Sequence, residues 1–200
     1  MSLNSNALIT LDDFKAYYGS ALTDKDHLAE IIINGVSQEF DRFCGRVLKQ
    51  ATYTNLYIDG NGQETLPLPN WPAASLTGVY EDSALLTEGL AYDFVLYSSD
   101  EDAYLRKVSA TWPELDEATE VWLEGPKTIK ISSVKLGYAT IPADIQLACL
   151  KQSAMEFQRM LKSEWGETSR SVGDGSIGLV EPGLLKDVEA VLRCYRRINI

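Results

Sequence analysis

The sequence has few of the residues on which most enzymes and metal sites depend. It contains one histidine, His27, which we expect on the solvated surface, and three cysteines, Cys44, Cys149 and Cys194. A single imidazole excludes most zinc sites and most histidine-based acid-base catalysis. No G-x-S-x-G turn is present to hold a nucleophilic serine. The cysteines are odd in number and far apart, so we expect buried free thiols in a reducing compartment.

Long apolar runs are also missing. No stretch is long and apolar enough to cross a membrane, and the N-terminus lacks the charged, apolar and small-residue regions of a secretory signal. We therefore expect a soluble, unexported protein with no membrane partner. A chain of 200 residues suits one domain, or at most two small ones.

Acidic residues exceed basic ones, 29 against 18, which gives a formal net charge of −11. The excess is concentrated in the middle of the chain. Residues 81–124 carry 12 Asp and Glu against 2 Lys and Arg, whereas residues 125–200 carry 8 against 11. Affinity for nucleic acid comes largely from clustered Lys and Arg. The composition therefore argues against general nucleic-acid binding.

Apolar residues spaced by three or four predict helices in both ends of the chain. Thr10 with Asp13, and Thr23 with Asp26, have the spacing of a capping box, in which a hydroxyl and a carboxylate satisfy backbone amides at a helix start. Gly19 is suited to end the first helix. The predicted helices cover residues 11–18, 23–47, 142–163 and a last segment that begins at Pro182.

Between the helices the apolar period changes to two, which predicts strands. Asp59-Gly60-Asn61-Gly62 supplies turn chemistry for a hairpin between residues 52–58 and 66–68. Three prolines in and after the second strand remove ladder donors, so this strand belongs at a sheet edge or leaves the sheet quickly. Further strands are predicted at residues 76–81, 92–97, 104–108, 120–123 and 127–138.

In the last of these strands, Ile129 and Ile131 have one phase, while Val134 and Leu136 have the other. A bulge at Ser132-Ser133 would place all four on one apolar face. The strands are therefore expected to form a small antiparallel sheet.

Helices bracket the strands instead of alternating with them, which argues against a parallel doubly wound sheet. We predict a fold that is mainly α with an inserted small antiparallel β module (α+β), built as a helical bundle of about four helices. The whole chain, residues 1–200, would form a single domain. Residues 8–50 and 142–198 would be its helical part, 52–140 the β module, and 163–183, rich in turn formers, a flexible loop.

Several apparent motifs do not indicate a site. Residues 173–178 match G-x-G-x-x-G by letter, but the strand and helix of a dinucleotide site do not flank them. A calcium loop counted from Asp59 would end at Asn70 and not at a bidentate Glu. We expect no cofactor and no metal. Trp71, Trp112, Trp122 and Trp165 could fill the core or serve an interface equally well.

Four landmarks resemble the head-tail connector (adaptor) family of tailed bacteriophages and prophages, and together they span most of the chain. They are Leu8-Ile9-Thr10-Leu11, Phe43-Cys44-Gly45-Arg46, the segment from Asp59-Gly60-Asn61-Gly62 to Trp71-Pro72, and Gly137-Tyr138-Ala139-Thr140-Ile141-Pro142-Ala143-Asp144. The acidic segment 85–124 is longer than expected for the family.

The resemblance implies a virion structural protein of the phage neck, made in the host cytoplasm, with no active site. Identical subunits would form a ring, of which a dodecamer is one form, beneath the portal protein. The ring would receive a downstream neck or tail protein and let DNA pass without sequence-specific binding. A ring needs only two complementary patches on each subunit.

Two groups of residues are candidates for these patches. The basic C-terminal turn, with Arg193, Tyr195, Arg196 and Arg197, is expected to engage the portal or neck. Acidic residues of the middle segment are expected to face the channel or the next subunit, and a negative channel wall would keep DNA from sticking. This acidic group comprises Asp100, Glu101, Asp102, Glu114, Asp116 and Glu117.

Two other functions remain open from sequence. One is another phage neck or tail-completion protein, which would contact different partners. The other is a small acidic carbohydrate-active hydrolase, because a pair of carboxylates is all that glycoside hydrolysis requires. Loss of activity on changing one carboxylate pair would distinguish the hydrolase.

Overall fold

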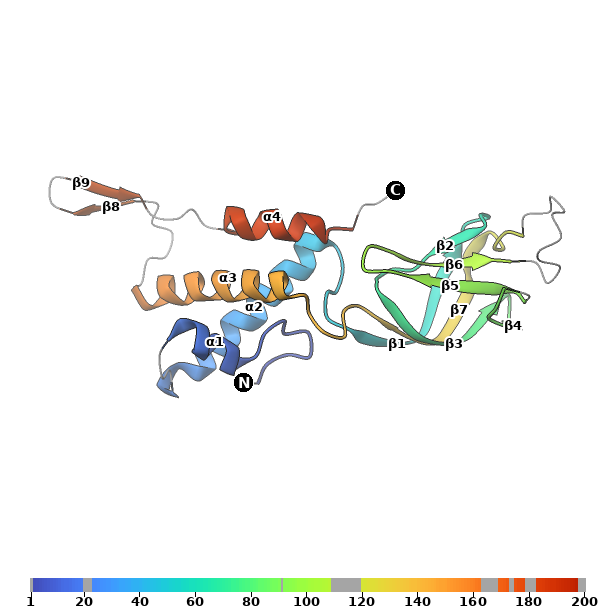
Figure 1. The fold of residues 1–200 in the computed structure, drawn as a ribbon, viewed down its shortest axis with the longest axis horizontal. Helices are drawn as coiled ribbons and strands as arrows, with labels where there is room; N and C mark the ends of the chain where they lie inside the picture. Colours follow the sequence, from blue (N-terminus) through green and yellow to red (C-terminus); the bar gives the residue numbers. More distant parts are fainter. Residues whose placement is uncertain are drawn as a thin grey trace. The chain divides into compact units, whose positions relative to one another are not determined.

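The computed structural model divides the protein into two compact units (Figure 1). Unit 1 comprises Met1–Leu48 and Ile141–Ile200, and unit 2 comprises Lys49–Thr140. That the two units act as a single domain stays a prediction. The structure describes residues 2–19, 23–90, 92–108, 120–162, 169–172, 175–178 and 183–197.

The described part of unit 1 is helical apart from one hairpin. Its elements are α1 (Leu11–Tyr18), the 3-10 turn η1 (Thr23–Lys25), α2 (Asp26–Cys44), α3 (Ala143–Lys162), α4 (Lys186–Cys194), and the hairpin of β8 (Ser169–Val172) and β9 (Gly175–Gly178). This hairpin lies in the segment predicted as a flexible loop, whose flexibility stays a prediction.

The capping box predicted at Thr10 and Asp13 is confirmed, and α1 ends at Gly19 in the left-handed conformation. The helix start predicted at Thr23 is corrected, because a 3-10 turn covers Thr23–Lys25 and α2 begins at Asp26. The side chain of Thr23 lies outside the described residues. The N-cap of α2 is Lys25, which makes no side-chain cap, and the carboxylate of Asp26 accepts a hydrogen bond from Lys15 at 2.7 Å.

Aromatic rings and one buried amide hold the helices of unit 1 together. The rings of Phe14 on α1 and Phe157 on α3 pack edge to face, with centroids 5.5 Å apart. Gln152 of α3 is fully buried, and its amide bonds the chain just before α4: it donates to the Gly183 carbonyl and accepts from the Leu185 amide. A buried polar group that is satisfied in this way fixes where α4 begins.

Unit 2 contains two antiparallel sheets. One has the order β1 (Ala51–Gly60), β7 (Gly125–Leu136), β3 (Ala73–Glu81) and β4 (Ala84–Leu86), and the other has the order β2 (Thr65–Pro67), β6 (Ala103–Lys107) and β5 (Phe94–Ser98). The inward residues of both sheets form one apolar core. At its centre, Trp122 is fully buried, and its indole N–H donates to the Leu105 carbonyl at 3.2 Å.

The predicted fold class is wrong. The chain is a mixed α+β fold with nearly as much strand as helix over the described residues, and not mainly a helical bundle. The strand content of the β module was underestimated because the module contains two sheets and not one small sheet. Its two sheets bury a core of their own between them, and two-layer packing of this kind makes unit 2 a compact body.

The predicted hairpin at residues 59–62 is also wrong. The strand before the turn pairs with β7, whereas the strand after it pairs with β6 of the other sheet. The chain therefore changes sheets here. The edge position predicted for the second strand is confirmed, because β2 is the outer strand of its sheet. Residues 120–123 are not a strand, and β4 was not predicted.

The apolar face of β7 changes phase as predicted, since Ile129, Ile131, Val134 and Leu136 are all buried. The cause differs from the prediction. The register between β1 and β7 is unbroken across this point, and the irregularity lies in the pairing of β3 with β7, between Ala74 and Thr77. The extra residue is therefore on the neighbouring strand.

Candidate interaction surfaces

The one histidine is exposed to solvent, and two of the three cysteines are buried. His27 is exposed in the first turn of α2. Burial raises the pKa of the Cys44 thiol to about 11 and that of Cys149 to about 12, so both stay protonated at neutral pH. Among the described residues, no three His, Cys, Asp or Glu side chains are grouped to hold a metal.

All three cysteines are free, as predicted. Cys194 is exposed, however, which corrects the prediction that all three are buried. It is the last residue of α4, where the buried stripe of Val188 and Leu192 has ended. No helix in the described part of the chain is long and apolar enough to span a membrane.

The four residues predicted for the portal or neck interface lie together at the end of α4, but in two different environments. Arg193 and Arg196 are exposed. Arg193 forms an ion pair with Glu189 one turn earlier, at 2.8 Å. Tyr195 and Arg197 are half-buried and bonded within unit 1: the Tyr195 hydroxyl donates to Asp144, and the Arg197 amide donates to the Cys44 carbonyl at 2.8 Å. The end of α4 therefore presents two arginines on a fixed base.

Asp100, Glu101 and Asp102 form an exposed turn between β5 and β6, which we call the acidic turn. Ser99 orders it. Its hydroxyl donates to the Asp102 carboxylate at 2.7 Å and accepts from the backbone amides of Glu101 and Asp102. The Tyr138 hydroxyl also donates to the Asp100 carbonyl at 2.9 Å. The carboxylates are therefore held on a rigid turn. Glu114, Asp116 and Glu117 lie outside the described residues.

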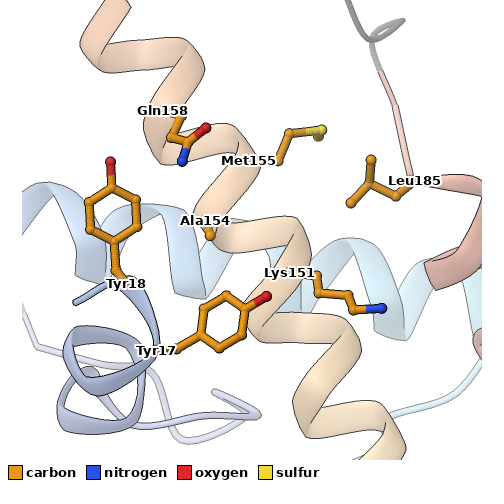
Figure 2. Close-up of a pocket in the computed structure, with 7 residues that line it drawn as sticks. All are labelled: Tyr17, Tyr18, Lys151, Ala154, Met155, Gln158 and Leu185. Carbon is orange, nitrogen blue, oxygen red and sulfur yellow. The ribbon is translucent and has the colours of Figure 1, made fainter.

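An open groove of about 640 Å³ lies along the outer side of α3. Tyr17 and Tyr18 of α1 flank it on one side and Leu185 on the other (Figure 2). From α3 itself it is lined by Lys151, Ala154, Met155 and Gln158. Its one charged group, Lys151, is bonded to Asp187 at 2.7 Å. Mixed apolar and polar side chains of this kind suit a protein contact.

Sequence reasoning did not predict this groove. Leu147 and Leu161 are 46% and 40% exposed. The apolar residues of α3 cover more of the helix than one core-facing stripe needs, and this excess was the available signal. Of the tryptophans, Trp122 fills the core and Trp71 packs against it, whereas Trp112 and Trp165 lie outside the described residues.

A solved structure described as "Neck of empty GTA particle computed with C6 symmetry" contains a chain with this fold. The TM-score is 0.56 at 12% sequence identity, and the match covers 100% of this chain and 95% of that one. A search of curated proteins found no match to the sequence.

A family model assigns the chain to a class of phage structural proteins, which is not a class of enzymes. A family model for head completion proteins matches residues 7–198, so the chain belongs to the head completion protein family. The predicted relation to phage head-tail connector proteins is thereby confirmed.

Proposed function

We propose that this protein is a head-to-tail connector subunit. Identical copies form a ring beneath the portal protein, join the DNA-filled head to a downstream neck or tail protein, and leave a central passage for DNA. The subunits are made in the host cytoplasm and join the particle during assembly. Family membership across residues 7–198 is the observation that carries this proposal.

The neck match is compatible with a ring. That neck was computed with six-fold symmetry, and a symmetric axis generates a ring when each subunit binds the next through a heterologous interface. A dodecamer would satisfy six-fold symmetry, as would a hexamer.

The basic end of α4 is the surface we assign to the portal. Arg193 and Arg196 are exposed, whereas their neighbours Tyr195 and Arg197 are bonded to unit 1. Two cations on a preorganised base lose little conformational entropy on binding. They therefore suit an acidic surface on the partner.

The acidity of unit 2 favours passage of DNA without binding. Unit 2 carries 14 Asp and Glu against 6 Lys and Arg. A surface of that sign repels phosphates and does not grip them. We place at least part of this acidity toward the channel or toward the next subunit.

The test is binding of the purified protein to the portal protein of the same phage. Exchanging both exposed arginines, Arg193→Gln and Arg196→Gln, should weaken binding at least about tenfold, because two charge-assisted contacts are lost. The matched control is Lys186→Gln, which removes one exposed charge at the opposite end of α4. It should bind like the wild type.

Equal binding by the double variant and the control would remove the arginines from the interface. Absence of any wild-type binding to the portal, with no ring in electron micrographs of the mixture, would overturn the connector role itself.

A further inference from the structure

The outward face of the four-stranded sheet carries a row of large side chains across all four strands. The register places Tyr57 of β1 opposite Lys130 of β7, Lys130 opposite Tyr80 of β3, and Tyr80 opposite Leu85 of β4. The residues beside them along each strand face the apolar core, so the row points away from it. We call these four residues the sheet row.

The two ends of the sheet row are exposed, and Tyr80 and Lys130 between them are half-buried. Tyr57 is 51% exposed and Leu85 is 63% exposed. The ammonium of Lys130 lies 5.5 Å from the centroid of the Tyr80 ring, in cation-π range. Tyrosine is among the residues that dominate protein interfaces.

Lys130 is also a charge without an ion-pair partner among the described residues of its own subunit. In the described part of unit 2, Arg106 and Lys107 are bonded to Glu64 and Glu81, whereas Lys130 forms no ion pair. It is thus available to an external carboxylate, in a unit whose charge is strongly negative.

The acidic turn of the same subunit is too far along the sheet to supply that carboxylate. The turn is tied to the start of β3, where the Ala73 amide donates to the Ser98 hydroxyl at 2.7 Å. Ala73 pairs with Leu136 and Tyr80 pairs with Lys130, six residues away along β7, a separation of about 20 Å at the usual rise of a strand. Turn and row are therefore separate patches of unit 2.

We propose that the acidic turn of one copy docks on the sheet row of the next copy. The carboxylates of Asp100 and Glu101 approach Lys130, and the turn covers the exposed rings and Leu85. Each copy then gives one patch and receives the other, which is the heterologous contact that closes a ring. The inference rests on the proposed function and names the subunit contact within it.

Charge exchange tests this contact. Lys130→Glu and Glu101→Lys should each weaken self-association at least about tenfold, because like charges would then face each other. A chain that carries both changes should recover most of the wild-type association, since every contact in the ring is again complementary. The control Lys25→Glu changes an exposed charge in unit 1 and should have no effect.

The readout is the mass distribution by sedimentation velocity, alone and with the portal protein. Single variants that assemble like the wild type, or a double variant no better than the singles, would overturn the contact. If one of these results is found while the wild-type protein binds the portal, the subunit contact is wrong but the connector role is retained. If the wild-type protein does not bind the portal, the connector role itself is contradicted.

A second measurement does not depend on strong association. Tyr57→Cys and Glu101→Cys are combined in a Cys194→Ser background, which removes the exposed native thiol. A short cross-linker with a maleimide at each end should give a ladder of linked copies on denaturing gels. A sample that associates like the wild type but gives no ladder contradicts the contact.

Discussion

The hydroxyl of Tyr195 donates one bifurcated hydrogen bond to the two carboxylate oxygens of Asp144, at 2.9 and 2.8 Å. Tyr195 follows the last residue of α4, and Asp144 lies in the first turn of α3, where a carboxylate also favours the helix dipole. One side chain thus ties the C-terminal helix to the body of unit 1. The exposed arginines on either side of Tyr195 gain their position from this bond.

Tyr195→Phe should lower the stability of the protein by about 1 kcal/mol, which corresponds to about 2–4 °C in Tm. The ring keeps its packing while the hydrogen bond to Asp144 is lost. The measurement is thermal unfolding by circular dichroism. Tyr57→Phe is the control, because its ring is half exposed on the sheet face. Equal Tm values for both variants would show that the bond to Asp144 does not hold α4.

Gly60→Ala should destabilise unit 2 by at least about 1–3 kcal/mol. A Cβ atom at this position would lie 1.7 Å from the Leu123 carbonyl oxygen and 2.5 Å from the Thr128 hydroxyl. Gly35→Ala in α2 is the matched control: its Cβ would meet nothing within 4 Å, and alanine is the better helix former by about 1 kcal/mol. Chemical denaturation should move the two variants in opposite directions. A Gly60→Ala protein as stable as the wild type would contradict the close approach at this turn.

Cys194 should react with a maleimide or with Ellman's reagent in the folded protein, whereas Cys44 and Cys149 should react only after unfolding. The reason is that the first thiol is exposed, while burial raises the pKa of the other two thiols and keeps them protonated. Mass spectrometry of the labelled peptides gives the order. Rapid labelling of Cys149 in the native state would be inconsistent with the buried position described.

Glu39→Gln should stabilise the protein at pH 7 by up to about 0.5 kcal/mol, a small effect because the side chain is partly solvated. Burial, and then the like charge of Glu156, raise the pKa of Glu39 above its ordinary value of 4.5. The folded state therefore disfavours the ionised form, and this cost is present above the raised pKa. It fades as the pH falls toward 4.5, so the gain of the variant should fade over the same interval. A gain that is constant between pH 7 and pH 4.5 would refute the assignment.

The helices of unit 1 were largely predictable because their signals are local. The hydroxyl and carboxylate of Thr10 and Asp13 sit three residues apart, and Gly19 ends the helix where it was expected. The box at Thr23 and Asp26 has the same letters, but α2 begins only at Asp26 with Lys25 as its N-cap, and the Asp26 carboxylate accepts a hydrogen bond from Lys15. A lysine eleven residues earlier is not visible to a local pattern.

Strand pairing in unit 2 was not predictable in the same way. Asn61 forms a local turn, with its side chain bonded to the Thr65 carbonyl and the Gln63 amide, so the turn chemistry was read correctly. Which strands lie on its two sides depends on long-range partners in β6 and β7. For the candidate surfaces, sequence located the basic and acidic groups. It could not show that Tyr195 and Arg197 are bonded inward, or that Tyr57, Lys130, Tyr80 and Leu85 form one row.

The most direct test of the connector role is the mass of the wild-type protein mixed with the portal protein of the same phage, measured by light scattering over a range of concentrations. We predict a complex that contains one portal assembly and a ring of copies of this chain. In electron micrographs the ring should appear as an added tier with a central hole. A mixture in which the portal keeps its own mass and this chain stays monomeric at every concentration would contradict it.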